Sequence, residues 1–174
     1  MGMWLMGSVA TSIVATENFY AVDRILKDST NVEFHREATK LGLPQTRELL
    51  RYLSSELNRQ YFSIWNVAQL GLGGLVLWLI AGSTTQDSAY LSGTRRAGPW
   101  GPSGLIIAML ASVVLMLAYL TPAIVSLGRA LDFVPRDPAP PGMQRFWNLH
   151  AAYTTLEMLK LLVGVVATWM LTRR

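Results

Sequence analysis

Two long stretches of the chain contain no charged side chain. The first covers residues 60–86 and the second covers residues 97–128. A bilayer core about 30 Å thick requires roughly 20 mostly apolar residues in a helix, and both stretches exceed that length. This pattern predicts membrane-spanning helices over residues 61–82 and 103–128.

Two further segments are apolar along most of their length but carry charged residues. Residues 3–24 are interrupted by Glu17, and residues 146–171 contain Glu157. Both have the length of a membrane span, and in lipid a helix satisfies its own backbone hydrogen bonds. The sequence therefore predicts an all-α fold in which residues 1–174 form a single integral membrane domain, a four-helix transmembrane bundle.

The connection between the first two predicted spans has structure of its own. Thr30-x-x-Glu33 is typical of a capping box at the start of a helix, and Gly42 is placed to end that helix. Further along, leucines recur at helical spacing with charged residues between them. We expect an amphipathic juxtamembrane helix between spans 1 and 2, lying along the membrane surface or continuing into span 2.

A continuous helix into the second span would be very long. Over residues 45–82 it would measure about 57 Å, so we expect it to bend near Asn58 or to project beyond the bilayer.

Residues 83–101 are rich in Ser, Gly and Thr, which predicts a loop. Residues 129–145 contain VPRDPAPPG, and so many prolines favour an extended crossing.

Composition narrows the possible chemistry. Only 15% of the residues are charged and 51% are hydrophobic, whereas a soluble domain carries about 25% charged residues. Because the chain has no Cys, it forms no disulfides, zinc–thiolate sites or iron–sulfur clusters, and it has no thiol nucleophile. The net charge of +4 is spread along the chain and indicates no nucleic-acid partner. The six Trp residues fall mostly near predicted span ends, as in an interfacial aromatic belt.

Lys and Arg are distributed unequally between the two sides of the predicted bundle. Ten of them lie on or beside the connections 25–60 and 129–145, and four lie on the opposite side, near the termini and in the second connection. The positive-inside rule therefore predicts that loops 25–60 and 129–145 are cytoplasmic. We expect an integral protein of a bacterial inner membrane, with both termini on the outer side.

Polar side chains lie at a similar depth in all four predicted spans. At 1.5 Å per residue, most of them fall about 8–13 Å below the surface that bears the first and third connections. Those on the last span recur at spacings of three or four and so form one stripe along the helix. The layer comprises Glu17, Asn18, Asn66, Gln69, Thr121, His150, Tyr153, Glu157 and Lys160.

Three interpretations of this layer are open at the level of sequence. It can consist of hydrogen bonds that fix helix packing, each contributing about 0.6–2 kcal/mol. It can be a pathway for a proton, an ion or a metal, because ionisable groups inside a membrane are usually functional. It can also bind a haem, a chlorin or a quinone, with His150 as the axial ligand within the membrane. His35 lies among charged residues and is expected to be solvated.

Three segments of the chain resemble a known family. They are MGSVATSIVATENFYAVDRIL, SSELNRQYFSIWNVAQLGLG and FWNLHAAYTTLEMLKLLVG. Together they are similar to the uncharacterised four-helix membrane family called domain of unknown function 4149, which is related to human transmembrane protein 205. The short motifs of that family would be filled here by Phe19 to Arg24, Tyr61-Phe62 and Phe146-x-x-Leu149-His150. The resemblance implies a four-helix membrane fold and no particular reaction, and the long 27–60 connection departs from it.

The expected function follows from what the loops and spans contain. The loops hold no nucleophile–base arrangement, so we expect a protein that is not an enzyme. The leading hypothesis is an accessory or structural subunit of a larger membrane protein complex, with the lipid bilayer and other membrane subunits as partners. A first alternative is a small oligomeric transporter or a proton or metal conduit that uses Glu17, His150, Glu157 and Lys160. A second alternative is a haem, pigment or quinone site at His150.

Overall fold

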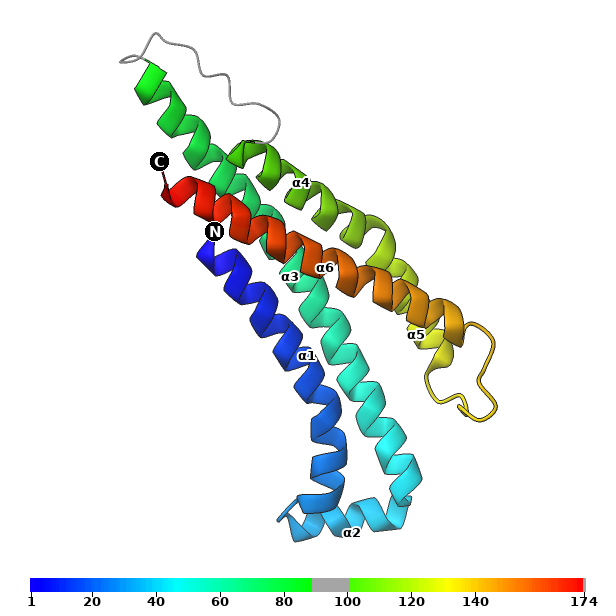
Figure 1. The fold of residues 1–174 in the computed structure, drawn as a ribbon. Helices are drawn as coiled ribbons and strands as arrows, with labels where there is room; N and C mark the ends of the chain where they lie inside the picture. Colours follow the sequence, from blue (N-terminus) through cyan, green and yellow to red (C-terminus); the bar gives the residue numbers. More distant parts are fainter. Residues whose placement is uncertain (89–100, 174) are drawn as a thin grey trace.

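Helices are the only regular secondary structure in the part of the chain that the structure, a computed structural model, describes. That part is residues 1–88 and 101–173, without the side chains of 83–88. The predicted all-α class is therefore confirmed (Figure 1). The elements are α1 (Gly2–Asp28), α2 (Val32–Leu41), α3 (Leu43–Ser88), α4 (Pro102–Leu115), the π-helical turn η1 (Met116–Leu120), α5 (Thr121–Leu131) and α6 (Met143–Thr172).

Three helical segments are long and apolar enough to cross a membrane. They are Leu43–Gly82, Pro102–Leu131 and Met143–Thr172. They contain the second, third and fourth predicted spans, which is consistent with a membrane protein. The helix α1, which contains the first predicted span, is long enough but is not among these three segments, because Ser and Thr residues together with Glu17 and Asn18 dilute its apolar residues.

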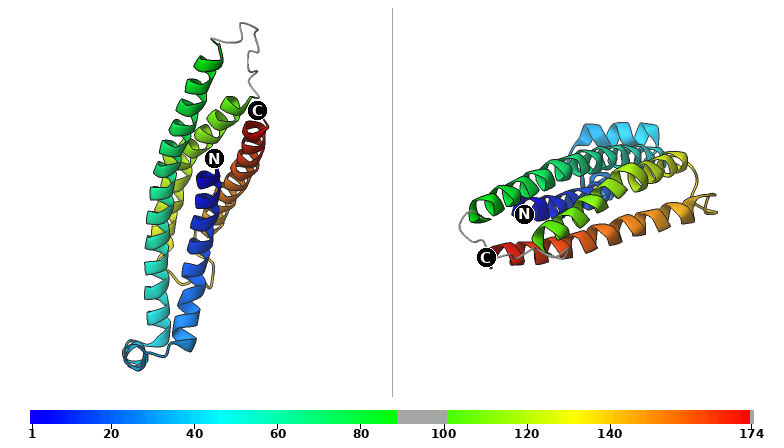
Figure 2. Two further views of the ribbon diagram at one scale, coloured as in Figure 1. Left: turned by 90° about the vertical axis from the view of Figure 1, so that its left-hand side faces the viewer. Right: turned by 90° about the horizontal axis from the view of Figure 1, so that it is seen from above.

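The long helices lie side by side over only part of their length. The helix α1 packs along α3, and α6 packs against α4 and α5. Figures 1 and 2 show that the C-terminal half of α1 and the N-terminal part of α3 continue beyond the ends of α5 and α6, with α2 across their tip. We name this projecting segment, residues 18–58, the arm, and the packed helices beyond it the bundle.

The short helix α2 forms where the sequence predicts it, but its first turn is capped by a different residue. The side chain of Asn31 accepts a hydrogen bond from the backbone N–H of Phe34 at 3.0 Å. The expected cap, Thr30, lies one residue too early, because Asn31 itself takes the extended conformation that a capping residue needs. At the other end, Gly42 has φ +95° and ends the helix, as predicted.

The helix α3 is a single rod of 46 residues. It begins directly after Gly42 and passes through Asn58 without a break, so at 1.5 Å per residue it is about 69 Å long. Of the two outcomes expected from the sequence, the structure shows no break near Asn58, and the helix is longer than a bilayer core is thick. The predicted loop at 83–101 is wrong in its first part: residues 83–88 continue α3, because no Gly or Pro follows Gly82 there to stop the helix. Residues 89–100 lie outside the described part of the chain.

The third predicted span is one rod with a wider turn in its middle. The helix α4 passes into η1 and then into α5, which starts at Thr121-Pro122. Pro122 has no N–H to donate to a carbonyl of the preceding turn, so the regular α-helical ladder is interrupted there. The π-helical turn accommodates the interruption, and Thr121 faces α3, where its hydroxyl accepts a hydrogen bond from Asn66.

Buried apolar side chains form two clusters in the bundle. The first joins α1 to α4 and comprises Trp4, Ile106, Met109 and Val113. The second joins η1 to α6 and comprises Met116, Leu120 and Tyr153. Many large apolar side chains on the outward faces of the helices are exposed, so these faces are suited to contact lipid or other proteins.

Candidate functional site

Two buried amides on α3 form the centre of a hydrogen-bonded network inside the bundle. Gln69 is 0% exposed, and its Oε1 accepts hydrogen bonds from Trp4 Nε1 at 2.7 Å and from Lys160 Nζ. Lys160 Nζ also donates to Glu157 Oε2 at 2.6 Å. One carbonyl oxygen thus connects α1, α3 and α6.

The second amide, Asn66, extends the network to the rod formed by α4, η1 and α5. Asn66 Oδ1 accepts hydrogen bonds from Gln69 Nε2 and from the hydroxyl of Tyr153, both at 3.3 Å. Asn66 Nδ2 donates to Thr121 Oγ1 at 3.2 Å. We name the connected residues the polar network. It comprises Trp4, Asn66, Gln69, Thr121, Tyr153, Glu157 and Lys160.

One buried side-chain atom of the polar network has no hydrogen-bond partner among the described residues. Glu157 Oε1 is buried and unpaired, whereas Oε2 of the same carboxyl holds Lys160. Buried polar atoms are nearly always hydrogen-bonded, and leaving one unpaired costs about 1–3 kcal/mol, more when the group is charged. Glu157 is therefore the position in the polar network with unused bonding capacity.

The polar network contains six of the nine residues that the sequence places in one layer. Glu17, Asn18 and His150 lie elsewhere. The Glu17 side chain is 56% exposed and pairs with Arg24 at 3.4 Å. Asn18 donates through Nδ2 to Asn58 Oδ1 at 2.7 Å, at the start of the arm.

The first helix enters the polar network at a different height from the one expected. The sequence-based placement assumed that span 1 ends near its charged residues at 23 and 24. Instead, Trp4 reaches Gln69, and the carbonyl of Ala15 accepts a hydrogen bond from Asn58 at 2.8 Å. Because α1 continues past the bundle into the arm, its first turns, rather than Glu17, lie beside the buried amides.

His150 lies on the same stripe of α6 but not in the polar network. It is half-buried, with its ring stacked on Phe146 at 6.0 Å between centroids and edge-on to Trp147 at 6.0 Å. The other histidine, His35, contacts the carbonyl of Ser29 through Nε2 at 2.7 Å. Within residues 1–88 and 101–173, three His, Asp or Glu side chains do not gather anywhere as a metal site would require.

Sequence reasoning missed the role of Trp4. It belongs to the six Trp residues assigned to an aromatic belt, but it is 1% exposed and donates to Gln69. Ser8 lies four residues after Trp4 and therefore on the same face of the helix. This spacing was the available sign that Trp4 faces the interior of the bundle. Trp78, by contrast, is 70% exposed, as an interfacial residue would be.

The helices α1 and α3 are in close contact at Gly7. Trp65 donates through Nε1 to Ser8 Oγ at 3.1 Å, and a Cβ at Gly7 would come within 2.0 Å of Trp65 Cη2. The Gly7→Ala variant is expected to lower the free energy of unfolding by about 1–3 kcal/mol, because the rigid indole must move and lose its hydrogen bond. Denaturant titration in mild detergent measures this.

The matched control for that prediction lies on the facing helix. A Cβ at Gly74 would meet nothing within 4 Å, so Gly74→Ala is expected to be neutral or to stabilise by up to about 1 kcal/mol through helix propensity. If the Gly7→Ala and Gly74→Ala variants were equally stable, the close approach at Gly7 would be contradicted.

A charged cluster joins α3 to the end of α5 at the base of the arm. Arg59 bonds to Glu56 and, through Nη2, to Asp132 Oδ2 at 3.0 Å. Arg129 donates to both carboxylate oxygens of Glu56, each at 3.3 Å. Gly128 leaves room for the Arg59 guanidinium, since a Cβ there would lie 3.0 Å from Nη2. These contacts mark the level at which charged residues replace the apolar faces of the bundle.

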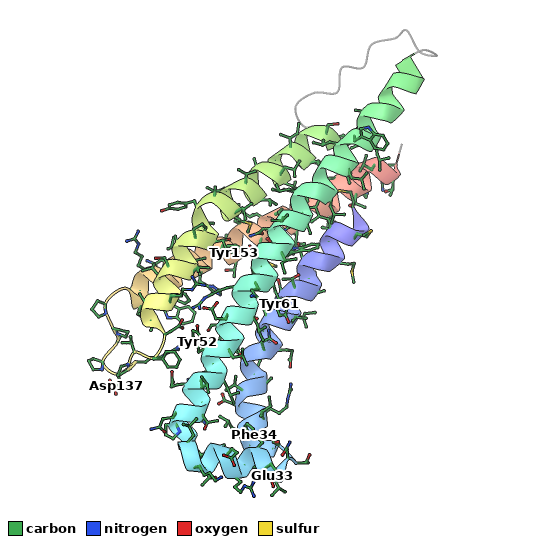
Figure 3. The ribbon with its side chains drawn as sticks, turned by 180° about the vertical axis from the view of Figure 1, so that it is seen from behind. Glu33, Phe34, Tyr52, Tyr61, Asp137 and Tyr153 are labelled. Atoms are coloured by element: carbon green, nitrogen blue, oxygen red, sulfur yellow. The ribbon has the colours of Figure 1, made fainter. Side chains whose placement is uncertain are left out.

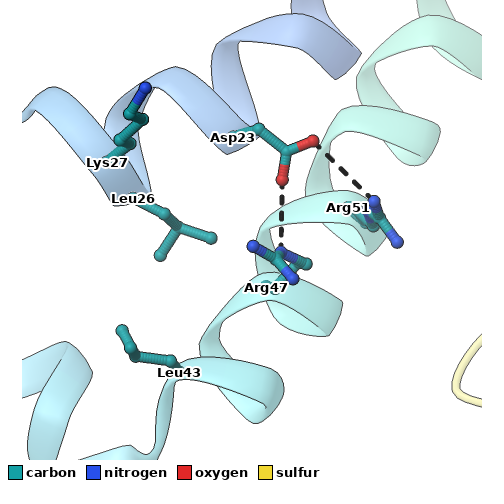
Figure 4. A pocket seen from close by; sticks show the side chains of 6 residues that line it. All are labelled: Asp23, Leu26, Lys27, Leu43, Arg47 and Arg51. Carbon is teal, nitrogen blue, oxygen red and sulfur yellow. Dashed lines mark ion pairs between the residues drawn. The ribbon is translucent and has the colours of Figure 1, made fainter.

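On one side of the arm, α1 and α3 enclose a basic pocket of about 440 Å³. Asp23 Oδ1 pairs with Arg47 Nε at 3.2 Å, and Asp23 Oδ2 lies 3.9 Å from Arg51 Nη2 (Figure 4). The pocket is lined by Asp23, Leu26, Lys27, Leu43, Arg47 and Arg51. Three cationic side chains thus surround one carboxylate over two leucines, a lining suited to an anionic group.

A second pocket of about 460 Å³ lies on another side of α3, with a largely apolar lining. The loop after α5 reaches the arm here, and the ring of Phe133 lies 5.1 Å from that of Tyr52. Figure 3 shows Tyr52 on the arm and Asp137 in the loop after α5, the loop that also holds Phe133. Phe133 has φ 60°, which is rare for a bulky residue. The pocket is lined by Leu41, Pro44, Gln45, Glu48, Leu49 and Phe133.

Comparison with known proteins adds no relative whose function could be transferred. No family model, no curated protein and no solved structure matches the chain. The resemblance to the four-helix family of unknown function therefore stays a prediction.

Proposed function

We propose that the chain is an accessory subunit of a membrane protein complex, anchored by a four-helix transmembrane bundle and binding its partner through the arm. The bundle would consist of α1, α3, the rod from α4 to α5, and α6. Three of these rods are apolar enough to cross a membrane by themselves. The N-terminal part of α1 would cross beside them, because it supplies Trp4 to the polar network.

The arm would lie outside the bilayer. It begins at the level of Arg59, Arg129 and Asp132, a cluster that suits the membrane surface better than the hydrocarbon core. Its helices carry charged residues on most faces, and α2 closes its far end. Lys and Arg are more numerous on the arm and on the loop after α5 than at the opposite end of the bundle. By the positive-inside rule, this difference favours a cytoplasmic position for the arm and the loop.

The apolar pocket of the arm is the observation that carries the proposal. Leu41, Leu49 and Phe133 are 53%, 51% and 57% exposed, although lipid would cover neither the arm nor the loop after α5. Clustered apolar side chains on a surface in water are typical of a protein–protein contact. The partner we infer therefore presents apolar side chains to this pocket.

The basic pocket, on another side of the arm from the apolar pocket, would add a charged contact to the same partner. Lys27, Arg47 and Arg51 lie around Asp23, so an acidic segment of the partner would be attracted to the arm and oriented on it. Such rim charges mainly affect the association rate and its salt dependence. Most of the affinity would come from the apolar contacts.

The experiment is purification of the full chain from its native membrane in mild detergent, with mass spectrometry of what remains bound. Wild-type protein is expected to elute with a stoichiometric partner. Leu49→Glu places a charge in the apolar pocket and is expected to weaken that association at least about tenfold. The control is Val32→Glu, because Val32 is also exposed on the arm but lines neither pocket.

Two results would contradict the proposal. One is a single stable species of 19.3 kDa from native membranes. The other is a partner that Leu49→Glu and Val32→Glu retain equally, which would place the contact elsewhere on the molecule.

A further inference from the structure

The cationic side chains of the basic pocket have hydrogen-bond donors that the arm itself does not use. Arg47 approaches Asp23 through Nε at 3.2 Å, and its Nη groups donate no hydrogen bond to a described residue. Arg51 lies 3.9 Å from Asp23 and 4.0 Å from Glu48, which is beyond hydrogen-bond range. The ammonium of Lys27 has no ion pair with a carboxylate of the described residues. The pocket therefore holds donors for a further anion.

The two helices of the arm bring these donors together by the spacing of their residues. Arg47 and Arg51 are one turn apart on α3, and Asp23 and Lys27 are one turn apart on α1. Both pairs line the same pocket (Figure 4). A guanidinium group offers a planar fork of N–H groups that matches two oxygens of a phosphate, and an ammonium adds a compact point charge. The donor set therefore suits a phosphate group.

Charge and size narrow the ligand further. Three cations and one carboxylate line the pocket, which leaves two positive charges to be balanced. A carboxylate ligand would balance one of them, whereas a phosphate monoester carries about −1.5 to −2 at pH 7. The volume of about 440 Å³ falls in the range of ligand pockets, about 300–1,000 Å³. Leu26 and Leu43 provide an apolar lining for the organic group of an ester.

We propose that the basic pocket binds the phosphate group of a phosphate monoester. The phosphate oxygens accept hydrogen bonds from Arg47 and Arg51, and Lys27 supplies the third positive charge. Asp23 lies beside the same two guanidinium groups, at 3.2 and 3.9 Å. It holds them in place while the pocket is empty and competes with the phosphate for them, so the carboxylate of Asp23 lowers the affinity of the site.

The position of the pocket along α3 favours a phosphate from the aqueous phase over a lipid headgroup. Arg47 precedes Arg59 by twelve residues of one helix, or about 18 Å. The headgroup region on one side of a bilayer is only about 5–8 Å thick. With the arm outside the bilayer, as proposed above, the ester is a small soluble molecule or a phosphorylated side chain of the partner. This choice of source rests on the proposed function, whereas the phosphate site does not.

Calorimetric titration of the full-length protein in nanodiscs of zwitterionic lipid tests this inference. The probe is phenyl phosphate, which is expected to bind more tightly than phenyl sulfate, an ester of similar shape with one negative charge. Arg47→Gln is expected to weaken the binding of phenyl phosphate at least about tenfold. Asp23→Asn is expected to strengthen it at least about threefold, because a competing negative charge is removed. A glycine-flanked phosphoserine peptide separates the sources: tighter binding than phenyl phosphate indicates a phosphorylated side chain, and weaker binding indicates a small ester.

The matched control is Arg36→Gln on α2. Arg36 also pairs with carboxylates of the arm, Glu33 and Glu37, but does not line the pocket, so this variant is expected to bind phenyl phosphate as the wild type does. The inference is overturned if phenyl phosphate does not bind, if Arg47→Gln and Arg36→Gln bind it equally, or if Asp23→Asn leaves the affinity unchanged. None of these results depends on the partner. A chain that purifies alone from native membranes would contradict the proposed function and leave the phosphate site standing.

Discussion

Replacement of Lys160 by methionine is expected to lower the free energy of unfolding by about 3–5 kcal/mol. The Lys160 side chain is 1% exposed and bonds to both Glu157 and Gln69. Methionine preserves much of the volume and removes the charge, so it leaves the Glu157 carboxylate buried with neither oxygen paired. Breaking a buried ion pair from one side is costly because the remaining charge has no compensation.

The chain offers a closely matched control for Lys160→Met. Glu37 and Lys40 have the same Glu-x-x-Lys spacing, with Nζ–Oε1 at 2.8 Å, but both side chains are more than half exposed. Lys40→Met is expected to change the stability by about 0.5 kcal/mol or less. The double variant Glu157→Met/Lys160→Met is expected to recover most of the loss, because an apolar pair replaces a buried ion pair at little cost.

Denaturant titration in mild detergent, followed by tryptophan fluorescence, measures all three variants. A loss for Lys160→Met no larger than the loss for Lys40→Met would show that the Glu157–Lys160 pair is not buried. A double variant as unstable as Lys160→Met would show that the loss of stability comes from the altered packing at position 160 and not from the unpaired charge of Glu157.

Gln69→Leu is expected to have the second-largest effect, a loss of about 3 kcal/mol. Gln69 Oε1 accepts from the indole N–H of Trp4 and from the ammonium of Lys160. Leucine fills similar space without an acceptor, so it leaves two buried donors without that partner, one of them charged. The cost of such donors exceeds that of the hydrogen bonds themselves.

The control for Gln69→Leu is Gln60→Leu on the same helix, since Gln60 is exposed and is expected to tolerate the change within about 0.5 kcal/mol. A second measurement is the indole N–H resonance of Trp4, which should shift in Gln69→Leu and stay in place in Gln60→Leu. An unchanged Trp4 resonance in Gln69→Leu would contradict the contact between α1 and α3.

The sequence was informative about which segments are helical and less informative about their relative heights. Charge-free runs and caps locate α2, α6 and the start of α3 to within a few residues, because these signals are local, whereas α3 continues six residues past its predicted end. The height of α1 depends on which residues of α3 it meets. Its charged residues mark the end of a span only if the helix stops at the membrane surface, and α1 continues into the arm.

The polar network was predictable in part for the same reason. Asn66, Gln69 and Lys160 are polar residues within apolar segments, so their positions alone indicate a shared interior. The bonds that join them depend on rotamers and on the packing of four rods. The unpaired state of Glu157 Oε1 is a property of that packing, and no spacing in the sequence encodes it.

The unbroken course of α3 has a mechanical consequence. Leu49 in the arm and Gln69 in the bundle are about 30 Å apart along one helix with no Gly or Pro hinge between them. A force applied at the tip of the arm would therefore tilt the whole of α3. The salt bridges of Arg59, which lie between the arm and the bundle, would resist this tilt. Any tilt that those bridges do not absorb would displace the carbonyl of Gln69 relative to Lys160, so a mechanical load on the arm would reach the polar network.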